Sequence, residues 1–282
     1  MQTIIGLGQA GCNIADHFSQ YPQYNIIKID TKLKKAKNTF NLKYHSNPEH
    51  YEKKLPVRLI KHLHQTVQSH TLFITSCGMV SGASLSILEK IKDKTQITVM
   101  YIIPHQTELV GDKKLQNTLL FNVFQEYARS ALFERVYLLD NQKMSDIIGP
   151  VPIMKRWESL NNLIASTYHM INVFEHTQPI LTTITNRIKT ARISTLGLLD
   201  EENNQEKMFF ELDIPREKNY YYGVPNKQLE EDVSLMEAIQ TNLKTNIEHD
   251  KMKITYSVYS TEYDKLLAYC EKSSTLIQKL AF

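Results

Sequence analysis

The first half of the chain alternates short apolar runs with amphipathic segments, and this alternation constrains the fold more than any other feature. The apolar runs are typical of buried strands, and the segments between them carry apolar residues at helical spacing. Strands that alternate with helices form a parallel sheet covered by helices, here a Rossmann-like α/β fold. The predicted strands are Thr3–Gly8, Tyr24–Asp30, His70–Thr75, Gln96–Pro104 and Arg135–Asp140, and the predicted helices are Cys12–Tyr21, Tyr51–Gln68, Ser84–Ile91 and Leu115–Phe133.

A long helical pattern at about Lys155–Phe174 divides the chain in two. It ends before Pro179, which cannot continue a helix. The sequence beyond it predicts a smaller α+β domain with a last helix at Asp264–Leu280. The predicted organisation is an N-terminal domain at 1–154, a central helix at 155–178 and a C-terminal domain at 179–282, with strands at Arg192–Leu199, Lys207–Ile214 and Lys253–Tyr259 and a helix at Leu229–Ile247.

The composition limits the possible partners. A formal net charge of +3, without a basic block, gives no indication of nucleic acid or an anionic membrane as a partner. The cysteines, Cys12, Cys77 and Cys270, fit neither a disulfide framework nor a zinc site, and no histidine spacing predicts a metal site. Neither an export leader nor an apolar run of membrane-spanning length is recognisable. We therefore expect a soluble, cytoplasmic protein.

A glycine-rich turn follows the first predicted strand. Gly6, Gly8 and Gly11 stand where this strand ends and the next helix begins. Residues without side chains let the backbone approach a phosphate at the positive end of a helix. A nucleotide is therefore the expected ligand of the N-terminal domain. Because Asp30 ends the second predicted strand, the same residues also fit a dinucleotide fingerprint, and this alternative stays open.

A second loop of small residues follows the third predicted strand. The stretch from Ser76 to Gly82 again leaves a strand and enters a helix. Two such loops in one sheet place two helix N-termini around one polyphosphate. Together with the residues around them, these loops resemble the nucleotide site of the tubulin/FtsZ superfamily, in which the second loop is the glycine-rich signature loop.

The resemblance assigns particular residues to the phosphates. Gln9 takes the position of a tubulin glutamine that lies near the phosphates and the metal. The family signature is Gly-Gly-Gly-Thr-Gly-(Ser/Thr)-Gly, and Met79 and Val80 replace its threonine and following glycine. A hydroxyl is lost and the backbone becomes stiffer, so we expect weaker affinity for the nucleotide than the family signature would give. The residues placed at the phosphates are Gly8, Gln9, Ala10, Gly11, Cys12, Cys77, Gly78, Met79, Val80, Ser81 and Gly82.

Two segments resemble the part of the family that recognises the guanine. Asn141 is similar to a tubulin asparagine that bonds the base, and its alternative is a helix cap. Trp157 and Asn161 resemble the start of the family's central helix, where an aromatic ring stacks on the base and an amide reads it. A ring and an amide four residues apart lie on one face of a helix. The alternative for Trp157 is an ordinary core residue.

The remaining matches concern the terminal phosphate and the sugar. Asn47 resembles the asparagine of an FtsZ loop that senses the terminal phosphate, although a solvated Asn-Pro turn explains it equally well. After Pro104 the family carries acids that contact the ribose. The resemblance assigns this contact to Asp112, with Glu108 nearby.

The resemblance implies a filament-forming protein of phage or plasmid type that binds GTP or GDP, with Mg²⁺ carried by the phosphates. Its partners would be other copies of itself, with host FtsZ or a cargo adaptor as further candidates. In this family, acids after the central helix position the water that attacks the next subunit's nucleotide. No Asp or Glu occurs from His176 to Leu199, so the catalytic residues stay unassigned, and we expect weak or absent hydrolysis unless Glu175 supplies the acid.

Two other functions remain open. An NAD-dependent oxidoreductase would use the first glycine turn and Asp30, but it gives no role to Asn141, Trp157 or Asn161. A non-polymerising inhibitor of the host FtsZ filament is compatible with the missing acids.

Overall fold

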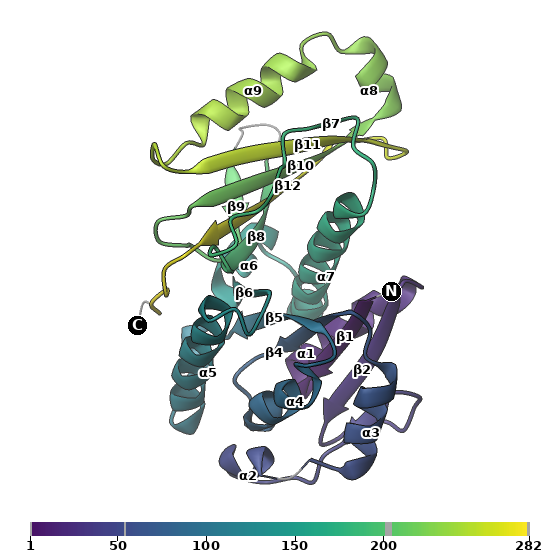
Figure 1. The fold of residues 1–282 in the computed structure, drawn as a ribbon, viewed down its shortest axis with the longest axis vertical. Helices are drawn as coiled ribbons and strands as arrows, with labels where there is room; N and C mark the ends of the chain where they lie inside the picture. Colours follow the sequence, from purple (N-terminus) through teal and green to yellow (C-terminus); the bar gives the residue numbers. More distant parts are fainter. Residues whose placement is uncertain (1, 54, 201–204, 281–282) are drawn as a thin grey trace.

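The structure is a computed structural model, and it describes residues 2–53, 55–200 and 205–280. Helices pack against both faces of a central sheet (Figure 1). The strands are β1 (Gln2–Leu7), β2 (Tyr24–Asp30), β3 (Thr39–Asn41), β4 (His70–Thr75), β5 (Gln96–Ile103), β6 (Arg135–Asp140), β7 (Leu181–Thr182), β8 (Ile193–Leu199), β9 (Glu206–Met208), β10 (Glu217–Pro225), β11 (Lys253–Thr261) and β12 (Leu267–Ser274). The α-helices are α1 (Gly8–His17), α2 (Glu49–Glu52), α3 (Val57–Thr66), α4 (Ser84–Ile91), α5 (Asp112–Arg129), α6 (Asn141–Ile148), α7 (Arg156–Glu175), α8 (Asn226–Glu231) and α9 (Leu235–Thr245). Short 3-10 helices are η1 (Phe18–Gln20), η2 (Met79–Ala83), η3 (Gln106–Glu108) and η4 (Ile153–Lys155).

One sheet runs through both halves of the chain, in the order β3-β2-β1-β4-β5-β6-β8-β12-β10-β11-β7, with β9 paired to β8. The strands from β3 to β6 are all parallel. The sheet continues into the C-terminal half through a short contact, in which Val136 and Tyr137 of β6 pair with Ile193 and Ser194 of β8. The predicted Rossmann-like α/β fold is confirmed, whereas the predicted domain boundaries remain a prediction.

The central strands of the N-terminal half, β1, β4, β5 and β6, are buried on both faces. Successive side chains of a strand point to opposite faces, so Ile5 and Leu7 pack in one cluster with α3, α4 and α5. Ile4 packs in the other cluster with α1 and α7. Parallel strands need this cover on both faces, which explains why the sequences of these four strands are mostly apolar.

Helix α7 contacts both halves of the molecule. Leu160 and Ile164 pack with the strands of the N-terminal sheet. At the other end of the helix, the ring of Phe174 stacks on Tyr259 of β11 with 4.5 Å between the ring centroids. Gly223 of β10 makes room for this stack, because a Cβ at this position would lie 2.7 Å from a ring carbon of Phe174. The central helix is therefore an element of both cores.

We expect His169 on α7 to make the stability of the fold depend on pH. Its ring stacks on Tyr21, and its Nδ1 lies 3.0 Å from the hydroxyl of Tyr24. Burial lowers the pKa of His169 below its ordinary value of 6.5. As the pH falls, His169 is therefore protonated in the unfolded chain before it is protonated in the folded protein. The contribution of the neutral, buried ring to the free energy of unfolding is complete above pH 6.5, and it is lost as the pH falls through the pKa of the folded protein.

We expect the urea midpoint of the protein to fall between about pH 7.5 and about pH 5.5. His169→Gln, which cannot be protonated, should lose less stability over the same interval. An equal loss in both proteins would show that other groups cause the pH dependence.

The predicted helix at Asp264–Leu280 is wrong, because Leu267–Ser274 forms β12 between β8 and β10. Ala268 and Cys270 pack on the face covered by α9, and Tyr269 packs on the face of α7. Since both faces are covered, β12 lacks the alternation of a half-exposed strand. The apolar residues after it, which extended the helical pattern, lie in an irregular segment.

Other elements differ from the prediction in their extent. The strand predicted at Lys207–Ile214 is only the short β9, and β10 was not predicted at all. The helix predicted at Leu229–Ile247 is broken into α8 and α9, because the carboxylate of Asp232 accepts hydrogen bonds from Ser234 and turns the chain. The helix predicted at Tyr51–Gln68 is broken into α2 and α3 near Pro56, and residue 54 of this range lies outside the described residues.

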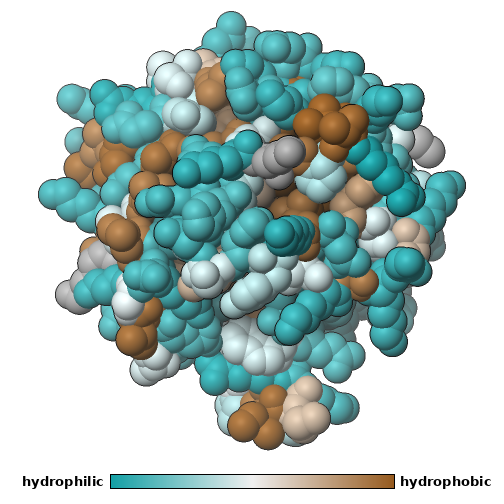
Figure 2. Space-filling view, turned by 90° about the horizontal axis from the view of Figure 1, so that it is seen from below, coloured by the Kyte–Doolittle hydropathy of each residue, from teal (hydrophilic) through white to brown (hydrophobic). Residues whose placement is uncertain are grey.

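The surface is mixed in polarity. On the face seen from below, apolar groups are interspersed with polar side chains (Figure 2). Among the described helices, none has the length and apolar character needed to cross a membrane.

Candidate functional site

A cavity of about 350 Å³ lies at the carboxyl ends of β1, β4, β5 and β6, next to the start of α7. Ligand sites of open parallel sheets lie outside the carboxyl ends of the strands, and they usually have volumes of this order. The lining residues are Leu7, Gly8, Gln9, Ala10, Asn13, Ile14, Ser76, Gly78, Ser81, Ile102, Pro104, Glu108, Lys113, Asn141, Trp157 and Asn161.

The first predicted loop forms one wall of this cavity. Helix α1 begins at Gly8, whose φ of +71° is easily adopted only by glycine. No side chain caps this helix, and its first turn contains no acid. Its first N–H groups therefore have no partner within the helix and favour an anion.

Two predicted residues of this loop lie behind the wall rather than in the cavity. Gly11 packs against the carbonyl of Ile74, where any side chain would collide. The thiol of Cys12 donates to the carbonyl of Gly6 at 3.3 Å, and burial raises its pKa to about 12. Both residues hold α1 against the sheet, and neither lines the cavity.

The second predicted loop contributes fewer residues than expected. Gly78 and Ser81 line the cavity together with Ser76, whose hydroxyl donates to the carbonyl of Ile102 at 2.7 Å. Of the other residues predicted here, Cys77 and Val80 belong to the hydrophobic core, and Met79 is exposed to solvent.

Gly82 has a packing role. A Cβ at this position would collide with the carbonyl of Pro48, so the glycine allows the segment around Pro48 to pack against η2. Asn47, the residue before Pro48, does not line the cavity. Its side chain accepts a hydrogen bond from the backbone N–H of Glu49 at 2.8 Å. This contact fits the Asn-Pro turn that was the alternative interpretation of Asn47.

The residues predicted to recognise the base all line the cavity, from α6 and α7. Asn141 is the first residue of α6 and lines the cavity, while Asp140 caps the helix by accepting a hydrogen bond from the N–H of Gln142 at 2.8 Å. Trp157 and Asn161 are one turn apart on α7. Trp157 is 49% exposed, so it is not an ordinary core residue.

A cation lies over the indole ring. The guanidinium of Arg156 lies 5.8 Å from the ring centroid of Trp157 and donates to the hydroxyl of Ser145 of α6 at 3.2 Å. The ring is thereby held close to α6 while its exposed surface faces the cavity and solvent. An exposed indole in this position can stack on a planar base.

An ion pair that the sequence did not predict also lines the cavity. Glu108 and Lys113 line the cavity, with 3.3 Å between Nζ and Oε2. The predicted residue Asp112 begins α5 but is not among the lining residues. Pro104, which follows β5, lines the cavity. Helical spacing could have identified Lys113, because residues 113 and 116 both face the signature loop, where Gln116 donates to Ser81 at 3.2 Å.

The lining fits a nucleotide better than a protein-bound metal. Among the described residues, no group of three or more His, Cys, Asp or Glu side chains is arranged to hold a metal ion. Asp30, which the dinucleotide alternative requires, lies outside the cavity, where its carboxylate accepts a hydrogen bond from the N–H of Thr31 at 2.7 Å.

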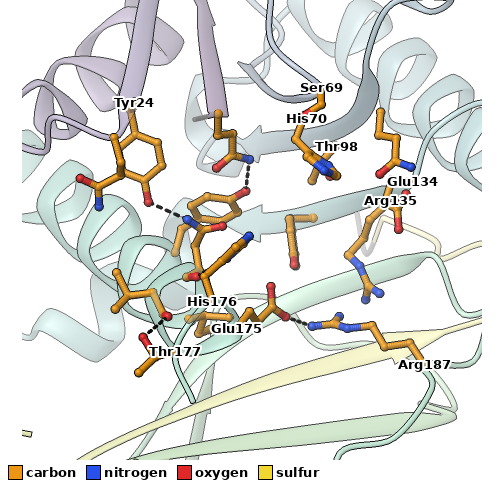
Figure 3. A pocket seen from close by; sticks show the side chains of 18 residues that line it. Tyr24, Ser69, His70, Thr98, Glu134, Arg135, Glu175, His176, Thr177 and Arg187 are labelled. Carbon is orange, nitrogen blue, oxygen red and sulfur yellow. Dashed lines mark hydrogen bonds and ion pairs between the residues drawn. The ribbon is translucent and has the colours of Figure 1, made fainter. Parts of the chain in front are cut away.

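A second cavity of about 670 Å³ lies at the amino ends of the same strands, beside the end of α7. In this cavity Glu175 and Arg187 point toward each other and form an ion pair (Figure 3). Glu175 also accepts a hydrogen bond from the hydroxyl of Tyr221 at 2.9 Å. Glu175, the acid nearest to the acid-free segment, is therefore already paired.

Comparison with known proteins gives a clear result for structures only. No protein-family model and no curated protein sequence matches the chain. Among solved structures, a GTPγS-form protofilament of TubZ from Bacillus thuringiensis serovar israelensis is similar, with 17% identity, a TM-score of 0.74, and coverage of 97% of this chain and 86% of that chain.

Two further solved structures are also similar to this chain. CetZ2 from Haloferax volcanii, a GTPγS-bound protofilament, has 14% identity and a TM-score of 0.71, with coverage of 96% of this chain and 92% of that chain. An FtsZ dimer from M. jannaschii has 11% identity and a TM-score of 0.68, with coverage of 96% and 87%. These likenesses extend over nearly the whole chain, and they show that it has the tubulin/FtsZ fold.

Proposed function

We propose that this chain binds GTP or GDP in the cavity at the carboxyl ends of β1, β4, β5 and β6, and that it assembles head to tail into filaments in the cytoplasm. The observation that carries the proposal is the arrangement of its walls. The lining combines an uncapped helix end at Gly8 with Asn141, Trp157 and Asn161. The helix end favours the phosphates of a nucleotide, and the three side chains favour a planar base. Mg²⁺ would be carried by the phosphates.

The geometry of the two ends supports assembly. Helix α7 begins at the nucleotide cavity and, after about 30 Å, ends at the second cavity, on the opposite edge of the sheet. Large apolar side chains are exposed near both ends: Ile153 and Met154 precede α7, and Ile180 and Leu181 follow it. The similar TubZ structures are described as protofilaments and as two-stranded and four-stranded filaments.

Slow or absent hydrolysis is part of the proposal. The segment that would approach the next subunit's nucleotide contains no acid from His176 to Leu199. Glu175 is paired with Arg187 and Tyr221, so it is not free to orient a water molecule. Persistent filaments would follow, because filament turnover depends on loss of the terminal phosphate.

Sedimentation and negative-stain imaging with GTP, GDP and no nucleotide test assembly, and phosphate release is measured in the same samples. We expect filaments with GTP and very little released phosphate. Brisk release by the wild-type protein would contradict slow hydrolysis, and its loss in Glu175→Gln would identify Glu175 as the acid. Monomers in every sample, together with blocked assembly of added FtsZ, would instead support the inhibitor function.

Lys113 gives a further prediction for this site. Its ammonium group lies in the cavity, and its removal should weaken GTP binding by about 10-fold, the lower end of the contribution of a hydrogen bond to a charged group. Lys113→Met is compared with Lys114→Met, which changes a neighbouring lysine outside the cavity lining, by calorimetric titration at low and high salt. Equal affinities of the two variants would exclude a phosphate contact by Lys113.

A further inference from the structure

The segment after β12 returns to the N-terminal half of the molecule. Residues 275–280 are irregular and extend from β12 toward α5 (Figure 1). Within this segment Gln278 is only 1% exposed. Its backbone N–H donates to the side chain of Gln125 at 2.7 Å, and its side-chain oxygen accepts a hydrogen bond from the backbone N–H of Asp213 at 2.6 Å.

Apolar contacts hold the same segment. Ile277 and Leu280 pack against the core cluster that contains Phe121 and Phe124 of α5. The flanking residues Leu276 and Lys279 are exposed. One face of the segment is thus fixed between α5 and the chain that follows β9, and the other face is free of packing.

The helix that this segment contacts also reaches the nucleotide cavity. Gln125 lies about 18 Å along α5 from Lys113, given the rise of a helix. Near its beginning, α5 places Lys113 in the cavity, and Gln116 donates to Ser81 of the signature loop at 3.2 Å. In between, the side chain of Asn117 accepts a hydrogen bond from Tyr101 at 2.8 Å. One continuous helix therefore connects the 275–280 segment with two lining residues of the cavity.

We propose that residues 275–280 form a clasp that regulates the nucleotide cavity through α5. While the clasp is docked, α5 is fixed along its length and holds Lys113 and the partner of Ser81 in place. When the clasp is released, α5 shifts or frays, and the cavity loses these two contacts. A coupling of this kind needs one element that both sites can influence, and α5 contacts both the clasp and the cavity. The inference rests on the proposed function of the cavity, and it adds its regulation.

The test uses a matched pair of double variants in the full chain. The clasp variant, Ile277→Ala with Gln278→Ala, removes the buried contacts, and the control, Leu276→Ala with Lys279→Ala, changes the exposed neighbours. Hydrogen exchange is followed in the first turns of α5, and the affinity for GTP is measured by titration. We expect faster exchange at residues 112–118 and at least about 5-fold weaker GTP binding in the clasp variant, a typical coupling between two sites.

Each outcome decides one question. Faster exchange confined to residues near 125 and 213, with unchanged affinity, would overturn the clasp. If the double variant unfolds, Gln278→Ala alone is used, because it keeps the apolar contacts, and the same two measurements decide. If the wild-type protein binds no nucleotide, the proposed function fails, whereas the exchange at residues 112–118 still tests the clasp by itself.

Discussion

Replacing Glu271 with glutamine is expected to lower the free energy of unfolding by about 3–5 kcal/mol, the usual cost of removing one partner from a buried ion pair. The side chain of Glu271 is fully buried on β12. It lies 2.6 Å from Arg135 and 2.7 Å from Arg187, and it accepts a hydrogen bond from Tyr137 at 3.0 Å. Burial favours the neutral acid, yet the two guanidinium groups lower the pKa of Glu271 below its ordinary value.

The expected loss follows from the position of this cluster. Arg135 lies on β6, and Glu271 lies on β12, so the ion pair bridges the two halves of the sheet where they meet. Without the carboxylate, Arg135 and Arg187 would remain largely buried next to each other. Urea unfolding at neutral pH measures the effect. The control is Glu211→Gln, whose carboxylate is 81% exposed in its pair with Lys143 and should change stability by at most about 0.5 kcal/mol. A similar small change for Glu271→Gln would contradict a stabilising role of the cluster.

Replacing Trp157 with alanine is expected to weaken the binding of GTP by about 5-fold to 150-fold, which corresponds to the 1–3 kcal/mol that base stacking on an aromatic ring contributes. Trp157 lines the cavity, and half of its surface is exposed, so the ring can be removed without opening the core. Trp157→Phe keeps an aromatic face and should retain most of the affinity.

Fluorescence titration with labelled nucleotide measures both Trp157 variants, and thermal unfolding shows whether they are folded. A Trp157→Ala protein that binds GTP as tightly as the wild type would mean that the base lies elsewhere. An equal loss for Trp157→Ala and Trp157→Phe would indicate a packing defect rather than lost stacking.

Much of the N-terminal half could be predicted from the sequence because its signals are local. The ranges predicted for Tyr24–Asp30, His70–Thr75 and Arg135–Asp140 are those of β2, β4 and β6, and Ser84–Ile91 is α4. Buried parallel strands have continuous apolar runs, and the turns after them need glycine or small residues. These features do not depend on the rest of the chain.

The C-terminal half could be predicted less well because its elements depend on their neighbours. β12 becomes a strand because β8 and β10 provide hydrogen bonds on both sides, and its sequence carries no such information. β10 includes the aromatic run Tyr220-Tyr221-Tyr222 and the charged residues Glu217 and Lys218, which are buried only because partners on other elements neutralise them. Periodicity cannot show this kind of pairing.

The residues of the candidate site also differ in how well the local sequence predicts their positions. The residues that follow a strand or begin a helix, such as Gly8, Gly78 and Asn141, lie in the cavity as their positions in the sequence suggested. Asp112 does not, because η3 and the start of α5 place Glu108 and Lys113 there instead. The path of the loop between β5 and α5 determines this choice, and spacing alone could not predict it.

The most direct test of the proposed function is an equilibrium titration of the nucleotide-free protein with GTP, ATP and NAD⁺ under the same conditions. Saturable binding of GTP that is clearly tighter than binding of ATP, with no binding of NAD⁺, is the predicted result. Tighter binding of NAD⁺, or no binding of any of the three up to millimolar concentration, would contradict a guanine-nucleotide site in this cavity.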